Sequence, residues 1–156
     1  MKYPENASMD NISYERKKST YERLRYAEDP DINGISYYSV ATYDHSNSAR
    51  DEDDLLYLLS SFVGYEGDYV EFEHDNNTIF YASSESSTRS KKTTWFEFFG
   101  LVKSNNSNQS LRYFYTVKCE EPDGDCSYNL GAIEEKVKEI MKSIEFRDVE
   151  LEGENN

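Results

Sequence analysis

The stretch Thr93–Lys103, TTWFEFFGLVK, decides the fold. Read as a strand, it places bulky apolar side chains on both faces, because successive side chains of a strand point to opposite sides. A strand that is apolar on both faces is buried on both sides. The sequence therefore predicts a central strand with a packed layer on either side of it. One face holds Trp95, Glu97, Phe99 and Leu101, and the other holds Phe96, Phe98 and Val102.

Turn sequences next to this stretch predict two antiparallel hairpins. The turn cluster SNNSNQS at Ser104–Ser110 leads into a second strand at Leu111–Lys118. Upstream, the turn Asp75–Asn77 separates a strand at Asp68–His74 from a strand at Thr78–Ser83, which favours a hairpin.

Two segments have the period of an amphipathic helix. Asp51–Val63 begins with four acidic residues, which the helix dipole favours, and Gly64 is a natural C-terminal stop. Ser48 and Asp51 resemble a capping pair. Ala132–Ile144 is the clearer helix. The apolar stripes are Leu55, Leu58, Leu59 and Phe62 in the first segment, and Ile133, Val137, Ile140, Met141 and Ile144 in the second.

The other segments complete the predicted order of elements. Ile35–Tyr43 is typical of a strand, and Ile12–Ala27 is mostly strand, with a short helix as the alternative. Ser83–Lys92 reads as a polar loop, and Ile144–Phe146 as a short final strand. We expect an α+β domain, a mostly antiparallel twisted sheet with helices packed on it. The expected organisation is a flexible terminus at 1–10, one domain at 11–147 and an acidic disordered tail at 148–156.

This order of elements resembles the PsbP/Mog-type superfamily, which also contains DcrB-like bacterial lipoproteins. The resemblance covers about residues 35–146, through GISYYSVATYD, DEDDLLYLLSSF, the Phe- and Tyr-rich hairpins and VKEIMKSIEF. It implies an α/β/α sandwich and provides no catalytic residues to carry over. Members are mostly non-catalytic, and include secreted lipoproteins, extrinsic photosystem subunits, a binder of a small GTPase and chaperones for secreted toxins.

The charge and the apolar pattern exclude several classes of partner. The 156 residues include 17 Lys+Arg and 31 Asp+Glu, a net charge of −14. Nucleic acids and anionic membranes need clustered cationic side chains, so we expect neither as a partner. No run approaches the roughly 18 apolar residues of a transmembrane segment. The first 20 residues show no signal peptide, which leaves a native start at Met1 or a removed signal as alternatives.

The sequence holds no arrangement typical of an active site or a metal centre. His45 and His74 are the only histidines, and both read as surface residues. Gly124 lies between Asp123 and Asp125, which is the wrong register for an EF-hand. Nucleophile-elbow, zincin, dinucleotide-binding and P-loop motifs are absent. We therefore expect no enzyme, no cofactor and no bound metal.

Cys119 and Cys126 flank a turn sequence, Pro122–Asp125. Their spacing does not match a CxxC redox or zinc motif. The turn would bring the two ends together, so a structural disulfide is expected, with two free thiols as the alternative. Such a bridge would stabilise the fold by roughly 2.5 kcal/mol. The acidic neighbours argue against reactive thiolates.

The 14 tyrosines give the strongest hint of function. Tyrosine is enriched at protein interfaces because it combines a large contact area with a polar tip. We expect an exposed Tyr-rich face on the sheet or hairpins, although tyrosine could also simply replace aliphatic residues. The candidate binding residues are Tyr69, Tyr81, Tyr113 and Tyr115.

Together these observations predict a non-enzymatic extracellular or cell-envelope domain of a bacterial lipoprotein. It would bind a protein or an envelope component, and the net charge favours a protein partner with a basic surface. The alternative is a cytoplasmic acidic interaction protein, such as a toxin-immunity protein, a secretion chaperone or a nucleic-acid mimic.

Overall fold

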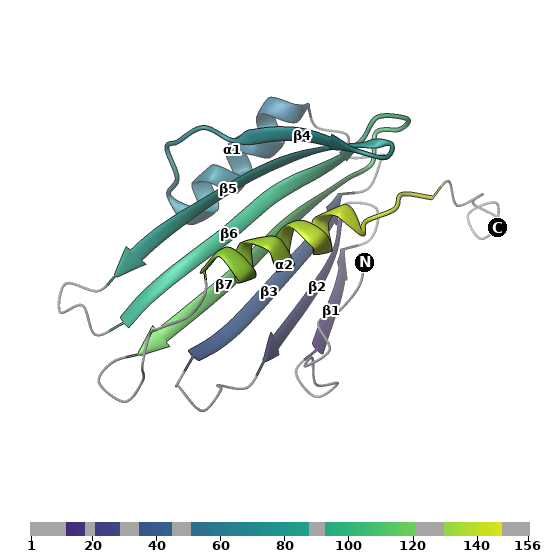
Figure 1. Cartoon of the computed structure of the whole chain (residues 1–156). Coiled ribbons are helices and arrows are strands. Elements are labelled where there is room, and N and C mark those ends of the chain that lie inside the picture. Colours follow the sequence, from purple (N-terminus) through teal and green to yellow (C-terminus); the bar gives the residue numbers. More distant parts are fainter. Residues whose placement is uncertain are drawn as a thin grey trace.

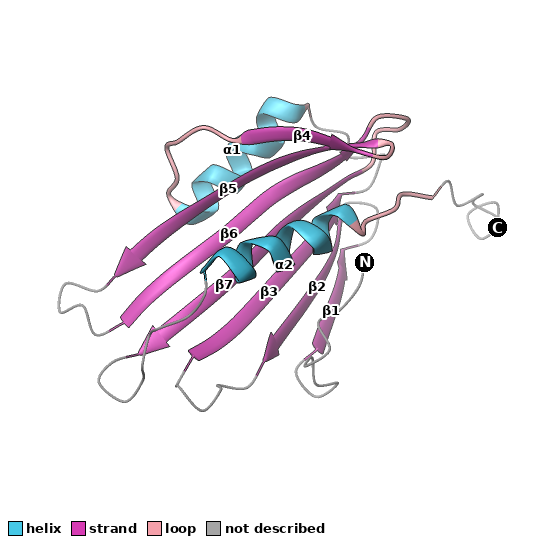
Figure 2. Ribbon diagram, in the orientation of Figure 1, coloured by secondary structure: helices cyan, strands magenta, loops and turns pink. Residues whose placement is uncertain are grey.

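A computed structural model describes residues 12–17, 21–28, 35–44, 51–87, 93–120 and 130–147. The elements are β1 (Ile12–Lys17), β2 (Tyr21–Glu28), β3 (Ile35–Asp44), α1 (Glu52–Val63), β4 (Val70–His74), β5 (Asn77–Ser87), β6 (Thr93–Ser104), β7 (Ser110–Glu120) and α2 (Leu130–Lys142). The strands form one antiparallel sheet (Figure 1). The helices pack on opposite faces, with α2 in front and α1 behind in the view of Figure 2. The predicted α+β class and the three-layer sandwich are confirmed.

The sheet is organised around β6. The strand order is β1-β2-β3-β7-β6-β5-β4, and β6 pairs with β5 along one edge and with β7 along the other. Phe99 and Leu101 face α1 and are 0% exposed. Phe98 and Val102 face α2 and are 4% and 0% exposed. The predicted central strand, covered on both faces, is confirmed.

Local sequence fixes both ends of α1. The Asp51 carboxylate accepts a hydrogen bond from the Asp54 amide at 2.8 Å, which caps the first turn. Gly64 adopts a left-handed conformation, with φ at 68°, and ends the helix there. Leu55 and Leu59 are buried. The predicted helix is confirmed. The predicted capping pair of Ser48 and Asp51 is wrong, because Asp51 is itself the N-cap, and Ser48 lies outside the described residues.

The second helix, α2, packs on the sheet beside Gly100 of β6. Its residues Val137, Ile140 and Met141 are buried, as the apolar stripe predicts. A Cβ atom on Gly100 would lie 2.8 Å from Met141 Sδ and would also contact the Phe80 carbonyl oxygen. The missing side chain at Gly100 therefore lets the helix approach β6 closely.

The strand predicted for most of Ile12–Ala27 is confirmed, because β1 and β2 pair antiparallel and neither contains the alternative helix. A second segment contains more strand than the sequence predicts. Part of the polar loop expected at Ser83–Lys92 is strand, because β5 continues to Ser87 and stays paired with β6. Backbone hydrogen bonds do not depend on side-chain polarity, so the ladder extends along this serine-rich sequence.

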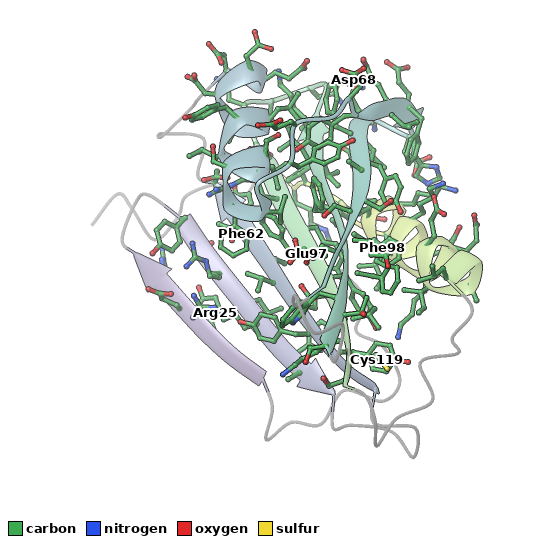
Figure 3. The ribbon with its side chains drawn as sticks, turned by 90° about the vertical axis from the view of Figure 1, so that its left-hand side faces the viewer. Arg25, Phe62, Asp68, Glu97, Phe98 and Cys119 are labelled. Atoms are coloured by element: carbon green, nitrogen blue, oxygen red, sulfur yellow. The ribbon has the colours of Figure 1, made fainter. Side chains whose placement is uncertain are left out.

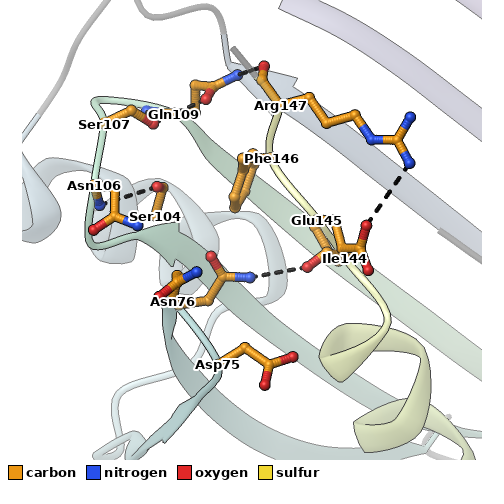
Figure 4. Close-up of a pocket in the computed structure, with 11 residues that line it drawn as sticks. Asp75, Asn76, Ser104, Asn106, Ser107, Gln109, Ile144, Glu145, Phe146 and Arg147 are labelled. Atoms are coloured by element: carbon orange, nitrogen blue, oxygen red, sulfur yellow. Dashed lines mark hydrogen bonds and ion pairs between the residues drawn. The ribbon is translucent and has the colours of Figure 1, made fainter.

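The short final strand expected at Ile144–Phe146 is wrong. Asn77 Nδ2 donates to the Ile144 carbonyl at 2.9 Å, and Gln109 Nε2 donates to the Arg147 carbonyl at 3.3 Å (Figure 4). Phe146 still packs against the core. Since side chains satisfy these carbonyl groups, the segment lies at the end of the sheet without joining its ladder.

The expected terminal segments, 1–10 and 148–156, lie outside the described residues. Their flexibility, and the extent of the domain between them, stay predictions. In the part of the chain that the structure describes, neither helix has the length and apolar character needed to cross a membrane.

We predict that Gly100→Ala destabilises the domain by about 2–3 kcal/mol, because the added methyl group overpacks against the Phe80 backbone of β5 and against Met141 of α2. Urea unfolding followed by circular dichroism measures this free energy. Ser86→Ala is the control, since it shortens an exposed side chain on β5 of the same sheet. Equal stability of the two variants would contradict the close packing around Gly100.

Candidate functional site

Three of the four candidate binding tyrosines are buried on the α2 side of the sheet. Tyr81 is 4% exposed, and Tyr113 and Tyr115 are 0% exposed. The expectation that these residues form an exposed face is therefore wrong. The Tyr113 hydroxyl accepts a hydrogen bond from Ser39 Oγ at 3.0 Å, and the Tyr115 hydroxyl accepts one from Lys136 Nζ at 3.1 Å. Burial raises the pKa of Tyr113 well above its usual value, so the core holds its neutral form.

Tyr69, the fourth candidate, lies on the opposite side of the sheet, beside α1. Its hydroxyl shares a hydrogen bond of 2.8 Å with Ser60 Oγ, and its ring meets Tyr65 and Phe99 edge-on. Burial raises the pKa of Tyr69 above its usual value. Because the sheet separates Tyr69 from the other three tyrosines, the four do not form one surface.

Only one of the two cysteines of the expected disulfide lies among the described residues. Cys119 lies near the end of β7, on the α2 side of the sheet, and is 0% exposed (Figure 3). Cys126 lies outside the described residues. The Cys119–Cys126 bridge therefore stays a prediction.

A groove of about 440 Å³ lies between α1 and the strands β2, β3 and β7. The helix forms its wall and the strands form its floor. Arg25 and Phe62 lie on this side of the sheet in Figure 3. The lining residues are Leu58, Ser61 and Phe62 from α1, and Arg23, Arg25, Tyr38, Val40, Thr42, Arg112 and Phe114 from the strands.

Phe62 gives the groove an exposed aromatic wall. Its side chain is 73% exposed, and its ring centroid lies 4.7 Å from that of Phe114. Tyr38, which also lines the groove, is 42% exposed. The sequence places Phe62 in the apolar stripe of α1, but Leu55 and Leu59 occupy the buried positions. Phe62 and Tyr38 thus expose apolar surface in the same groove, and contiguous exposed apolar surface is typical of a binding site.

The same groove contains three arginines, although the chain is acidic. Arg112 is neutralised, because its Nε and Nη2 donate to the two Asp44 carboxylate oxygens at 2.9 and 3.0 Å. Arg23 and Arg25 come within 3.9 and 3.8 Å of the Glu15 carboxylate, which is beyond hydrogen-bond distance. Loose, solvent-exposed pairs of this kind contribute little free energy. A partner carboxylate could therefore compete with Glu15 for these two guanidinium groups.

Sequence reasoning missed these arginines. In the β2 sequence YERLRYAE, Arg23 and Arg25 are two residues apart, so a strand places both on one face. That signal was present, but the neighbours of β2 were not predictable from it. Arg23 lies opposite Thr42 and Arg25 lies opposite Val40 only because β2 pairs with β3 in this register.

The chemistry of the groove follows from its lining side chains. Among the described residues, these include no histidine, cysteine or carboxylate that could act as a base. His74 lies elsewhere, 3.5 Å from Asp75, and His45 lies outside the described residues. Among the described residues, no group of three or more His, Cys, Asp or Glu side chains could hold a metal ion.

Comparison with known proteins assigns the chain to a family. A family model described as "Putative lipoprotein YvcA" (YvcA_Mog1p) matches residues 1–145. The chain belongs to this family. "Putative lipoprotein YvcA" of Bacillus subtilis (strain 168) is 25% identical over 122 residues, which cover 76% of this chain and 51% of that protein. The chain thus spans about half the length of this YvcA relative. No solved structure gives a significant match.

Glu97 lies on β6, on the groove side of the sheet (Figure 3). Burial raises the pKa of this carboxyl above its ordinary value of 4.5, because burial disfavours the charged form. The folded state therefore binds this proton more tightly than the unfolded state. The stability that Glu97 contributes is complete below the unfolded pKa and is lost as the pH rises through the folded pKa.

We predict that Glu97→Gln stabilises the protein at neutral pH relative to the wild type, with the gain shrinking as the pH falls through the pKa of Glu97. Urea unfolding at several pH values measures the difference. Glu85→Gln on the neighbouring strand β5 removes an exposed carboxylate and is the control. A Glu97→Gln difference that does not change with pH would contradict the raised pKa.

Proposed function

We propose that this chain is a non-catalytic binding domain of a cell-envelope lipoprotein, and that it holds a segment of a partner protein in the groove beside α1. One observation carries the proposal. The exposed Phe62 ring packs over Phe114, in the same groove as the Arg25 guanidinium. An apolar ring and a loosely paired cation share one cavity, so a single ligand can contact both.

Family membership supports the envelope location. The family and its Bacillus subtilis relative are both described as lipoproteins. The expected Cys119–Cys126 disulfide fits an extracytoplasmic compartment, because disulfides persist in oxidising environments. No cysteine among the described residues is free. The cytoplasmic alternative gains no such support from the family.

The groove favours a partner segment that combines an aromatic or aliphatic side chain with carboxylates. The apolar side chain would enter between Phe62 and the strand floor at Val40 and Phe114. A carboxylate beside it would meet Arg25, and arginine binds carboxylates with two parallel hydrogen bonds. The negative net charge of the chain predicts a basic partner surface, whereas the groove itself is positively charged through its arginines. An acidic segment in the groove and a basic surface around it are compatible in one partner.

Selection from a random peptide library displayed on phage tests this proposal. We expect the selected sequences to contain Phe, Trp, Tyr or Leu next to Asp or Glu. We predict that Phe62→Ser and Arg25→Glu each weaken the selected peptides by about tenfold or more, because each removes a central anchor of the contact.

Tyr57→Ser is the matched control for these variants. Tyr57 is also a large exposed residue of α1, at 71% exposure, but it does not line the groove. Its replacement should leave peptide affinity unchanged. Selected sequences without acidic residues, or peptides that bind the Phe62→Ser and Arg25→Glu variants as tightly as the wild type, would refute the proposed site.

A further inference from the structure

We infer that a second, polar pocket binds a neutral saccharide, and this inference does not depend on the groove. The pocket has a volume of about 500 Å³. It lies where the β4–β5 turn, the β6–β7 loop and the segment after α2 meet (Figure 4). Its lining residues are Asp75, Asn76, Asn77, Ser104, Asn106, Ser107, Gln109, Ile144, Glu145, Phe146 and Arg147.

Hydrogen bonds between the three segments hold the pocket in place. Asn77 and Gln109 bind the carbonyls of Ile144 and Arg147, which fixes the segment after α2. The backbone N–H of Asn105 donates to the backbone carbonyl of Asn76 at 2.8 Å, which joins the turn to the loop. A pocket whose walls are already bound to one another loses little conformational freedom when a ligand enters.

The side chains that remain available match the chemistry of a sugar hydroxyl. A hydroxyl group donates one hydrogen bond and accepts others, so it fits an amide that offers a donor and an acceptor together. Asn76 and Asn106 are exposed, and their amide groups make no side-chain hydrogen bond within the described part of the chain. Asp75 adds a carboxylate at the same rim; one of its oxygens lies 3.5 Å from His74 Nε2, and the other can accept from a ligand. A polyhydroxylated ligand can satisfy all of these groups at once.

Phe146 supplies an apolar surface in the otherwise polar wall. Its ring is only partly buried, with the Tyr43 ring behind it at 6.4 Å between centroids. A pyranose ring has polar edges and a C–H face, and an aromatic ring offers a large apolar contact for such a face. The combination of amides, a carboxylate and one aromatic ring therefore fits a sugar better than a purely polar solute.

The charges of the pocket argue against the other ligand classes. Among the described residues, two carboxylates, Asp75 and Glu145, and one cation, Arg147, line the pocket, and Arg147 pairs with Glu145 at 3.8 Å. An anionic ligand would be repelled by this arrangement. The lining is too polar for a lipid chain, and no cluster of ligands for a metal ion exists among the described residues.

Nuclear magnetic resonance of the isotope-labelled full chain tests the inference. The probes are tetra-N-acetylchitotetraose and maltotetraose, two neutral oligosaccharides. We expect saturable shifts in the side-chain amide signals of Asn76 and Asn106, with a dissociation constant of about 1 mM. The double variant Asn76→Ala/Asn106→Ala should weaken binding about tenfold, because it removes two sets of hydrogen bonds.

The controls separate this pocket from the groove. Ser86→Ala removes an exposed hydroxyl from β5, outside both cavities, and should leave the affinity unchanged. Phe62→Ser changes the groove and should also bind the probes normally. Adding sodium glucuronate should produce no saturable shift in the pocket. No shift with either neutral probe, or shifts centred on Phe62, would overturn the inference.

Discussion

The side chains of β6 are buried on both faces of the sheet, and the rest of the structure follows from covering them. Seven strands at a spacing of about 4.8 Å span roughly 29 Å across the sheet. A helix with its side chains is only about 10 Å wide. One helix per face can therefore cover β6 and its nearest neighbours but not the whole sheet. The strands left uncovered on the α1 side provide the floor of the groove.

This geometry explains which aromatic side chains are buried and which are exposed, a distinction that the amino-acid composition does not show. Tyr113 and Tyr115 belong to β7, next to β6, so the α2 side of the core takes them in. Phe62 belongs to the end of α1, where the helix reaches the edge of its contact with the sheet. The density of tyrosines therefore says little about the binding surface. Position relative to the two helices decides which aromatic rings remain available.

Local patterns predicted the elements that depend on local chemistry. The alternation in β6, the stripe of α2 and the ends of α1 at Asp51 and Gly64 could all be inferred before the structure was known. The groove could not, because it requires β3 to lie between β2 and β7. That pairing joins segments far apart in the sequence, and no periodicity encodes it. The missing final strand has a similar cause, since its carbonyls are bound by Asn77 and Gln109.

The charge distribution connects the fold to its proposed role. The chain has a net charge of −14, yet three arginines line the groove. Arg112 is held by Asp44, so its charge belongs to the structure rather than to a ligand. Arg25 has only a loose contact with Glu15 and lies beside an exposed aromatic wall. The account therefore assigns recognition to Arg25 and Phe62, and stability to the buried tyrosines and the Asp44–Arg112 pair.

A double-mutant cycle between Arg25 and the carboxylate of a selected peptide tests the central claim most directly. The cycle combines Arg25→Ala with replacement of the peptide Asp by Asn, and isothermal titration measures the four affinities. The account predicts a coupling free energy of about 1 kcal/mol between the two groups. Additive effects, with a coupling near zero, would show that the groove arginine does not contact the partner.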